Sequence, residues 1–534
     1  MEASAASLHA LETVVLLLLV MVAAFAVIAH RLKIPYPIVL VLAGLVLSFV
    51  PRVPRIPLNP ALVFAIFLPP LLYSSAWTVS WRDFRRNIVV IALLAVGLVA
   101  FTVWGIAEFS DRFITALDWK AGFLLGAVTS TTDAIAATSV ARSVGLPRRI
   151  VDILEGESLL NDSTGLLALE IGIRLLERGE LPTVSAGLAR LVYLIVAGLG
   201  IGLALGIFVG WLEKFIDNGP VELVVSVVVP YAAYLAGEEA KASGVLAVVA
   251  CGLYMSRQSA RIFSPAVRLQ LWSGWQAITF VLNGIVFVLI GLQMSYVLAG
   301  IRGGYSMATL LEYGAVFSVM LISLRMVWVV PAVTVANVLA KWRHKETTEN
   351  RETFVIGWTG MRGVLALAAA ISVPEVINGK PFAARNLIIF LAFSVIFVTL
   401  VVQGLSLPWL IRALGLAGRG GMEAEERYAR RVALREAIRY LEEEMTEQGA
   451  EYVHVFNDLL DKYHHRLNEL GEGGVDEKEV EAAQHLTRLV KGAIERERAA
   501  VILLRDQGAI SDDVLRTMER ELDLEESRYQ GEPG

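Results

Sequence analysis

Long apolar runs constrain the fold of this chain more than any other feature of its sequence. The runs LETVVLLLLVMVAAFAVIA (11–29) and LIIFLAFSVIFVTLVV (387–402) contain a single charged residue, Glu12. A helix needs about 20 mostly apolar residues to cross a bilayer, and only helices and closed barrels satisfy their backbone polar groups there. With 56% hydrophobic and 19% charged residues, the chain is too apolar for a water-soluble protein of 534 residues. We therefore predict an all-α polytopic membrane protein.

Charge divides the chain into two parts. Residues 419–534 hold 17 Lys and Arg against 28 Asp and Glu, a net charge of −11, whereas residues 1–418 have a net charge of +6. The second part lacks a run long enough to cross a bilayer, and its apolar residues recur at the three- and four-residue spacing of amphipathic helices. We predict a transmembrane domain over 1–418 and an acidic helical tail over 419–534. The predicted tail helices cover 427–448, 450–470, 477–508 and 510–529.

Thirteen apolar stretches of the first part are separated by charged residues, proline or glycine. They lie near 11–30, 34–50, 60–76, 87–107, 119–140, 150–173, 187–213, 220–236, 243–256, 270–299, 309–340, 353–373 and 384–413. Lysine and arginine are more frequent in one alternate set of the intervening loops, which is typical of cytoplasmic loops. We expect thirteen spans of the cell membrane, with the N-terminus outside and the tail in the cytoplasm.

Five ionisable residues lie deep within these stretches: Asp133, Glu157, Asp162, Arg325 and Arg362. A charge at the centre of a membrane helix costs about 2.5–3.5 kcal/mol on insertion scales, so each of the five needs a partner or a function. Asp133 follows the hydroxyl-rich run 129–132, which can unwind and offer carbonyl oxygens to a cation, as interrupted transporter helices do. Hydrogen bonding between helices is the alternative explanation for such a run.

The densest polar group is EGESLLNDSTG (155–165). Glu157 and Asn161 share one face of a helix, and Ser158 and Asp162 share the neighbouring face. Arg325 is about 16 residues from either end of its span, too far to reach water, so it must meet a carboxylate inside the bundle. We expect Asp162 to be the carboxylate left without a counter-ion, and hence a site for a cation or a proton. The alternative is that one carboxylate forms a structural ion pair and the other is hydrogen-bonded.

Three short motifs follow one another on three different spans: TTDA (131–134), GESLLND (156–162) and GMRG (360–363). Together with PPLLYSSAWTVSWRDFRRN (69–87), they resemble the sodium/proton exchangers, specifically the electroneutral bacterial NhaP-type antiporters of the cation/proton antiporter superfamily. The resemblance covers about the first 415 residues. It implies a homodimer built from two inverted repeats, with spans five and twelve interrupted and crossing near the membrane midplane. Spans 4–6 and 11–13 would form a core that moves against a dimerisation scaffold of spans 1–3 and 8–10.

The resemblance also implies roles for individual residues. Asp162 would carry the cation and the proton in turn, and Glu157 would pair with Arg325. Arg362 would lie in the interrupted span twelve, where a cluster of glycines also favours an interruption. Many relatives have proline after the aspartate of span five, where this chain has Ala134. The alkali-cation ligands would be Asp162, Asp133, Thr132 and Ser158, supported by Asn161, Glu157, Arg325 and Arg362.

The sequence therefore predicts a secondary antiporter and not an enzyme. Its substrates would be a proton and a monovalent cation, sodium first and potassium or lithium as alternatives, and it would serve pH homeostasis. Because position 161 is asparagine and not a second aspartate, we expect electroneutral one-for-one exchange, as the resemblance also implies. No cofactor and no nucleic acid are expected, since phosphate-binding glycine loops and a basic soluble face are absent from the sequence. Two alternatives are a gated cation channel and a cation- or pH-sensing transceptor that signals through its tail.

Overall fold

The computed structural model describes residues 2–50, 60–114, 116–179, 183–301, 305–342, 347–418, 422–448, 453–469, 477–507 and 509–529. The chain divides into two compact units, Met1–Gly420 and Gly421–Gly534. The predicted boundary after residue 418 adjoins residues 419–421, which lie outside the described residues. Each unit is described by itself.

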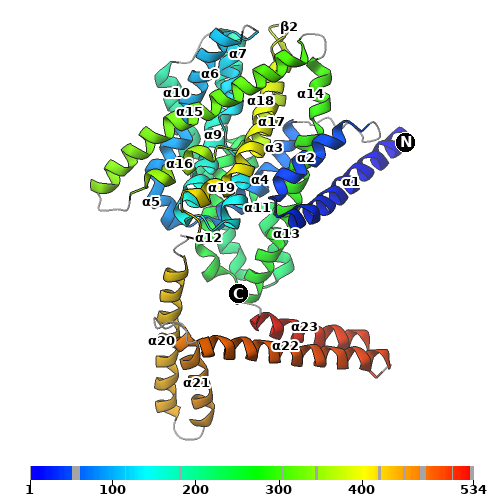
Figure 1. The fold of residues 1–534 in the computed structure, drawn as a ribbon, viewed down its shortest axis with the longest axis vertical. Coiled ribbons are helices and arrows are strands. Elements are labelled where there is room, and N and C mark those ends of the chain that lie inside the picture. The colour runs from blue at the N-terminus through cyan, green and yellow to red at the C-terminus, as the bar shows by residue number, and fades with distance from the viewer. Residues whose placement is uncertain are drawn as a thin grey trace. The chain divides into compact units, whose positions relative to one another are not determined.

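The first unit consists almost entirely of helices (Figure 1). Its α-helices are α1 (Glu2–Leu32), α2 (Tyr36–Ser48), α3 (Pro60–Ile66), α4 (Leu68–Thr78), α5 (Trp81–Ala92), α6 (Val99–Phe113), α7 (Trp119–Thr129), α8 (Ala134–Ser143), α9 (Arg148–Arg178), α10 (Val184–Leu212), α11 (Gly219–Glu239), α12 (Gly244–Ile262), α13 (Pro265–Leu292), α14 (Met294–Ile301), α15 (Met307–Trp342), α16 (Asn350–Trp358), α17 (Val364–Ile371), α18 (Arg385–Val398) and α19 (Gly404–Ala413). Short π- and 3₁₀-helical segments continue some of them: η1 (Leu93–Leu98), η2 (Glu213–Phe215) and η3 (Thr399–Gln403). Strands β1 (Val376–Ile377) and β2 (Lys380–Pro381) form an antiparallel hairpin.

Each predicted apolar stretch falls on one of these helices or on a run of consecutive ones. Within the described residues, eight helical segments are long and apolar enough to cross a membrane, and the bent pair α7 and α8 adds a ninth. Four predicted stretches fail that test: α2 is short, α16 and α17 are separated, α9 contains many charged residues, and the last turns of α12 are polar. The first unit is therefore a multi-pass membrane region.

Two helical segments are interrupted. Asp118 caps the start of α7, because its Oδ1 accepts a hydrogen bond from the amide of Ala121, and the helix ends at Thr129. α8 starts only at Ala134, at an angle of 43° to α7. The second interruption separates α16, which ends at Trp358, from α17, which starts at Val364. Runs of hydroxyl residues and of glycine favour such breaks because both residue types disfavour helix continuation.

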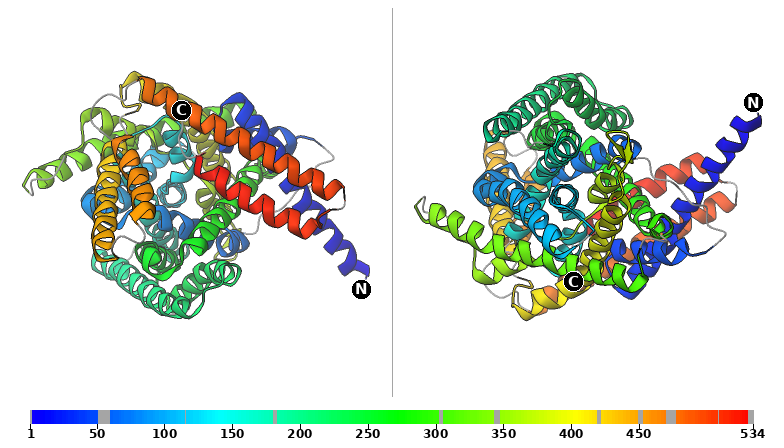
Figure 2. Two further views of the ribbon diagram at one scale, coloured as in Figure 1. Left: turned by 90° about the horizontal axis from the view of Figure 1, so that it is seen from below. Right: turned by 90° about the horizontal axis from the view of Figure 1, so that it is seen from above.

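The long helix α9 occupies an interior position. It contacts α4, α5, α6, η1, α7, α8, α12, α16 and α17. By contrast, α1 contacts α2 and α13, and its N-terminal end extends away from the other helices of this unit (Figure 2). Apolar side chains of α1 such as Leu16 and Val20 are more than half exposed, which leaves one face of this helix for lipid or another protein surface.

The second unit contains two helix pairs. α20 (Met422–Gln448) packs on α21 (Val453–Glu469), and α22 (Glu477–Asp506) packs on α23 (Asp512–Tyr529). Arg498 joins the second pair by hydrogen bonds to Asp523 (2.7 Å) and Glu526 (2.8 Å), and these bonds raise the pKa of its guanidinium. The hydroxyl of Ser511 accepts a bond from the amide of Val514 and so caps α23.

Candidate functional site

The two interrupted segments meet directly. The backbone amide of Asp133, in the first interruption, donates a hydrogen bond of 2.8 Å to the carbonyl of Met361, in the second. Arg362 strengthens this crossing from the second segment: its Nε donates to the carbonyl of Thr129 (3.2 Å), the last residue of α7. A guanidinium at the carbonyl end of a helix is favourable because that end has a partial negative charge.

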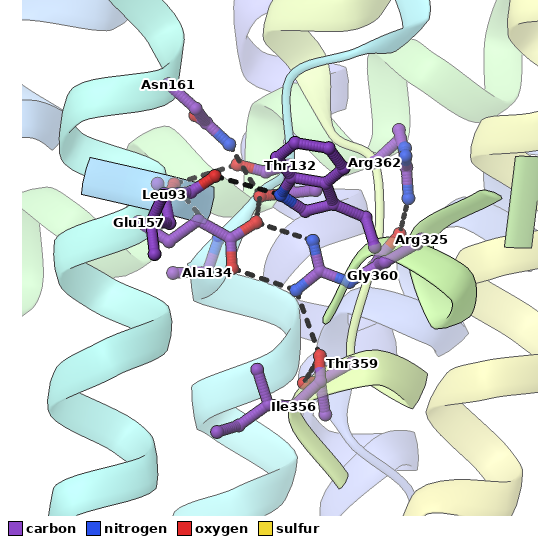
Figure 3. A network of polar contacts seen from close by, with 12 residues as sticks. Leu93, Thr132, Ala134, Glu157, Asn161, Arg325, Ile356, Thr359, Gly360 and Arg362 are labelled. Carbon is purple, nitrogen blue, oxygen red and sulfur yellow. Dashed lines mark hydrogen bonds and ion pairs between the residues drawn. The ribbon is translucent and has the colours of Figure 1, made fainter. Parts of the chain in front are cut away.

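A buried ion pair lies beside the crossing. Arg325 on α15 donates from Nη1 to Oε1 of Glu157 (2.5 Å) and from Nη2 to Oε2 (2.9 Å), and both side chains are 1% exposed. Nη2 also donates to the carbonyl of Ile356 on α16 (3.0 Å). This two-fold contact neutralises one of the buried carboxylates of α9, and it joins α9 to α15 and α16 (Figure 3).

Thr132 connects the ion pair to the first interruption. Its hydroxyl donates to Oε1 of Glu157 (3.0 Å) and accepts from Nδ2 of Asn161 (2.7 Å), as Figure 3 shows. Ser158 completes the attachment: its hydroxyl donates to the carbonyl of Thr132 (2.8 Å) and accepts from the amide of Ala134 (3.3 Å). Side chains of α9 therefore hold the residues between α7 and α8 in position.

Asp162 differs from the other predicted residues. Its side chain is 6% exposed, yet it makes no hydrogen bond or ion pair with any residue that the structure describes. Asp133 is nearby, and its Oδ1 accepts the amide of Ile135 (2.8 Å). Both carboxylates line a cavity of about 80 Å³ together with Thr132 and Ser158. Since a water molecule occupies about 30 Å³ of liquid, this space holds only two or three small ligands.

The structure thus brings Asp133, Thr132, Ser158 and Asp162 around one cavity. Glu157 and Asn161 lie behind Thr132, away from the cavity walls, and Arg325 and Arg362 lie beside the helix ends. Such a set of carboxylate, hydroxyl and carbonyl oxygens, without histidine or cysteine, suits a hard cation.

Further polar residues line the cavity and were missed from the sequence, among them Ser75 on α4, Thr138 on α8, Glu155 on α9 and Asn283 on α13. Asn283 is 4% exposed and also lines a larger cavity of about 800 Å³ with Tyr36, Trp77 and Arg268. A polar amide inside the apolar stretch 270–299 is a sequence signal of a polar environment. Asn283 lines both cavities and therefore lies between them.

Comparisons with known proteins agree with this architecture. Residues 15–413 match the family model described as "Sodium/hydrogen exchanger, transmembrane". An uncharacterised Na⁺/H⁺ exchanger of Mycobacterium tuberculosis is 33% identical over 96% of this chain and 95% of its own length. The Na⁺/H⁺ antiporter ApNhaP of Aphanothece halophytica is 34% identical over 77% of this chain and 75% of its own.

One further relative and one solved structure extend the comparison. The sodium, potassium, lithium and rubidium/H⁺ antiporter of Bacillus pumilus is 31% identical over 85% of this chain and 69% of its own length. The solved structure of the sodium proton antiporter MjNhaP1 from Methanocaldococcus jannaschii superimposes with a TM-score of 0.60, covering 78% of this chain and 99% of its own. At 21% sequence identity that structure supports the fold alone.

Proposed function

The chain belongs to the sodium/hydrogen exchanger family as an NhaP-type cation/proton antiporter, a transporter and not an enzyme, and we propose that it exchanges one sodium ion for one proton by alternating access. Potassium and lithium are alternative substrates, because the related protein of Bacillus pumilus is named for transport of several alkali cations. The exchange needs no cofactor, since both ions are substrates.

The observation that carries the proposal is the unpaired, buried carboxylate of Asp162 beside Asp133. A bare carboxylate removed from water is costly, and either a proton or a cation relieves that cost. The two ligands therefore compete for Asp162, and each crosses the membrane only when the other has left. Asp133, Thr132 and Ser158 supply further oxygens to the cation.

Electroneutral exchange is supported by the charges at positions 157 and 161, and it requires Asp133 and Glu155 to keep the same charge in both loaded states. Arg325 compensates the charge of Glu157, and Asn161 has no charge. Neither residue therefore needs a second cation to balance it. One monovalent cation or one proton then neutralises Asp162 equally. The loaded carrier has the same charge in both directions, and the membrane potential does not favour either.

The proposed movement involves thirteen spans in two inverted repeats. Spans 4–6 and 11–13, which include both interruptions, would move as a core against spans 1–3 and 8–10. The exposed apolar face of α1 supports a homodimer contact through the scaffold. We place the N-terminus outside the cell membrane and residues 419–534 in the cytoplasm, where the acidic tail would regulate the core without transporting ions.

Flux measurements in sealed vesicles test the proposal. An inward sodium gradient should release protons from vesicles that contain the protein, and clamping the membrane potential at different values should leave the rate unchanged. A sodium current without proton release would identify a channel. A protein that changes its tail conformation with sodium but moves no ions would be a transceptor.

A further inference from the structure

A second large cavity lies against another face of α9 and shares no lining residue with the cavity around Asp162. It has a volume of about 530 Å³ and lies between α5, η1 and α9 on one side and α10 and α12 on the other. We call it the apolar groove. Apolar side chains dominate its lining, among them Phe84, Val96, Leu160, Leu199, Val249 and Leu253.

Water is a poor occupant for the apolar groove. The hydroxyl of Ser163 bonds to that of Ser243 (2.8 Å), and the hydroxyl of Thr164 donates to the carbonyl of Leu160 (3.3 Å). The two hydroxyl groups that α9 contributes to the lining thus have partners within the protein, whereas a buried water needs two to four polar partners of its own. An empty space of this size would forfeit dispersion contacts along its whole lining.

One end of the apolar groove is polar. Arg257, near the end of α12, lines the groove, is exposed, and has no hydrogen-bond or ion-pair partner among the described residues. Trp81, the first residue of α5, also lines the groove, and Ser256, next to Arg257, donates to the carbonyl of Trp77 (2.7 Å), four residues before Trp81. Indole rings favour the membrane interface, and a guanidinium binds phosphate oxygens in a forked geometry.

The length of the apolar groove matches one leaflet of a bilayer. Along α12 its lining extends from Leu246 to Arg257, which at 1.5 Å per residue is about 16 Å. The hydrocarbon core of a bilayer is about 30 Å thick, so a groove of this length that starts at the interface ends near the midplane.

We infer that the apolar groove binds a phospholipid of the cytoplasmic leaflet, with one acyl chain between the two walls and the headgroup phosphate at Arg257. The leaflet and the effect on transport rest on the proposed function. In that scheme α5, η1 and α9 belong to the moving core, whereas α12 belongs to the scaffold. An acyl chain lodged between them stabilises the present arrangement, so a bound phospholipid slows exchange.

Native mass spectrometry of the full-length chain with dioleoyl phosphatidylglycerol tests binding without any transport assay. We expect one saturable lipid. Ala92→Phe places a ring in the groove from α5 and should abolish its binding, whereas Ala100→Phe, on the exposed face of α6 outside the groove, is the matched control and should retain it. Arg257→Gln should weaken binding about fivefold, as expected for one basic contact of about 1 kcal/mol, while Arg261→Gln should not.

Equal binding to the Ala92→Phe and Ala100→Phe variants would overturn the inference. So would equal affinity of the wild type and Arg257→Gln, since an occupant without headgroup recognition is any apolar molecule, detergent included. The proposed function can fail separately. Saturable lipid binding in a protein that exchanges no ions would leave the site intact and refute the antiport mechanism.

Discussion

Gly363 and Asp133 approach so closely that only glycine fits: a Cβ atom at position 363 would lie 2.1 Å from Oδ2 of Asp133. The two residues cannot move apart easily, because the amide of Asp133 donates a hydrogen bond to the carbonyl of Met361, two positions before Gly363. The two interrupted segments therefore approach this closely only because position 363 has no side chain.

Gly363→Ala should consequently reduce exchange strongly. The added methyl group must displace the Asp133 carboxylate or separate the segments, and overpacking of this kind costs about 1–3 kcal/mol. The measurement is sodium-driven proton release together with the melting temperature. Gly200→Ala, where an added Cβ would meet nothing within 4 Å, is the matched control and should behave as the wild type. Normal exchange by Gly363→Ala would show that the segments can separate without loss of function.

Asp162→Asn should abolish exchange while preserving the fold. The substitution keeps the shape of the side chain but removes the charge that a cation or a proton would neutralise, and no described residue loses a bonding partner. Glu312→Gln, on an exposed position of α15, is the control and should exchange normally. The assay is proton release in vesicles at several pH values. A substantial rate in a correctly folded Asp162→Asn protein would assign the carrier role to another residue.

Glu157 and Arg325 should behave as a structural pair. Removing one partner leaves a buried charge without compensation, at a cost of about 3–5 kcal/mol, so Glu157→Gln and Arg325→Gln should each lower the melting temperature or the folded yield. The double variant should recover part of that loss, because it removes both charges together. The readout is a double-mutant cycle of thermal unfolding. Strictly additive losses would contradict the two hydrogen bonds between these side chains.

Much of this arrangement could be predicted from the sequence, because an unpaired charge is costly inside a membrane. The mid-span position of Arg325 requires a carboxylate partner, and helical periodicity places Glu157 and Asp162 on neighbouring faces of α9. The sequence cannot reveal which distant helix closes the cavity. Asn283 and Ser75 come from α13 and α4, and their approach to Asp162 depends on tertiary packing and not on any local pattern.

The extent of the interruptions was also only partly predictable. The hydroxyl run before Asp133 and the glycines around Arg362 indicate weak helices, yet not where each helix resumes. The helix resumes as α8 at Ala134, whose amide donates a hydrogen bond to the hydroxyl of Ser158. A side chain of α9 therefore helps to fix the end of the interruption. Alanine at this position keeps an amide that proline would lack, and the bond to Ser158 uses it.

Removing residues 419–534 should leave exchange intact but shift its dependence on pH or on cation concentration. The tail contains no membrane-spanning run, and its net charge of −11 opposes the +6 of the remaining chain, so attraction to basic loops can bias the position of a moving core. That attraction weakens with salt, because charges are screened over about 8 Å at physiological ionic strength. The difference between full-length and shortened proteins should therefore shrink as choline chloride, a salt without an alkali cation, is raised in vesicle assays at fixed sodium. A shortened protein that inserts and folds normally yet exchanges no ions at any pH would mean that the tail belongs to the transport machinery.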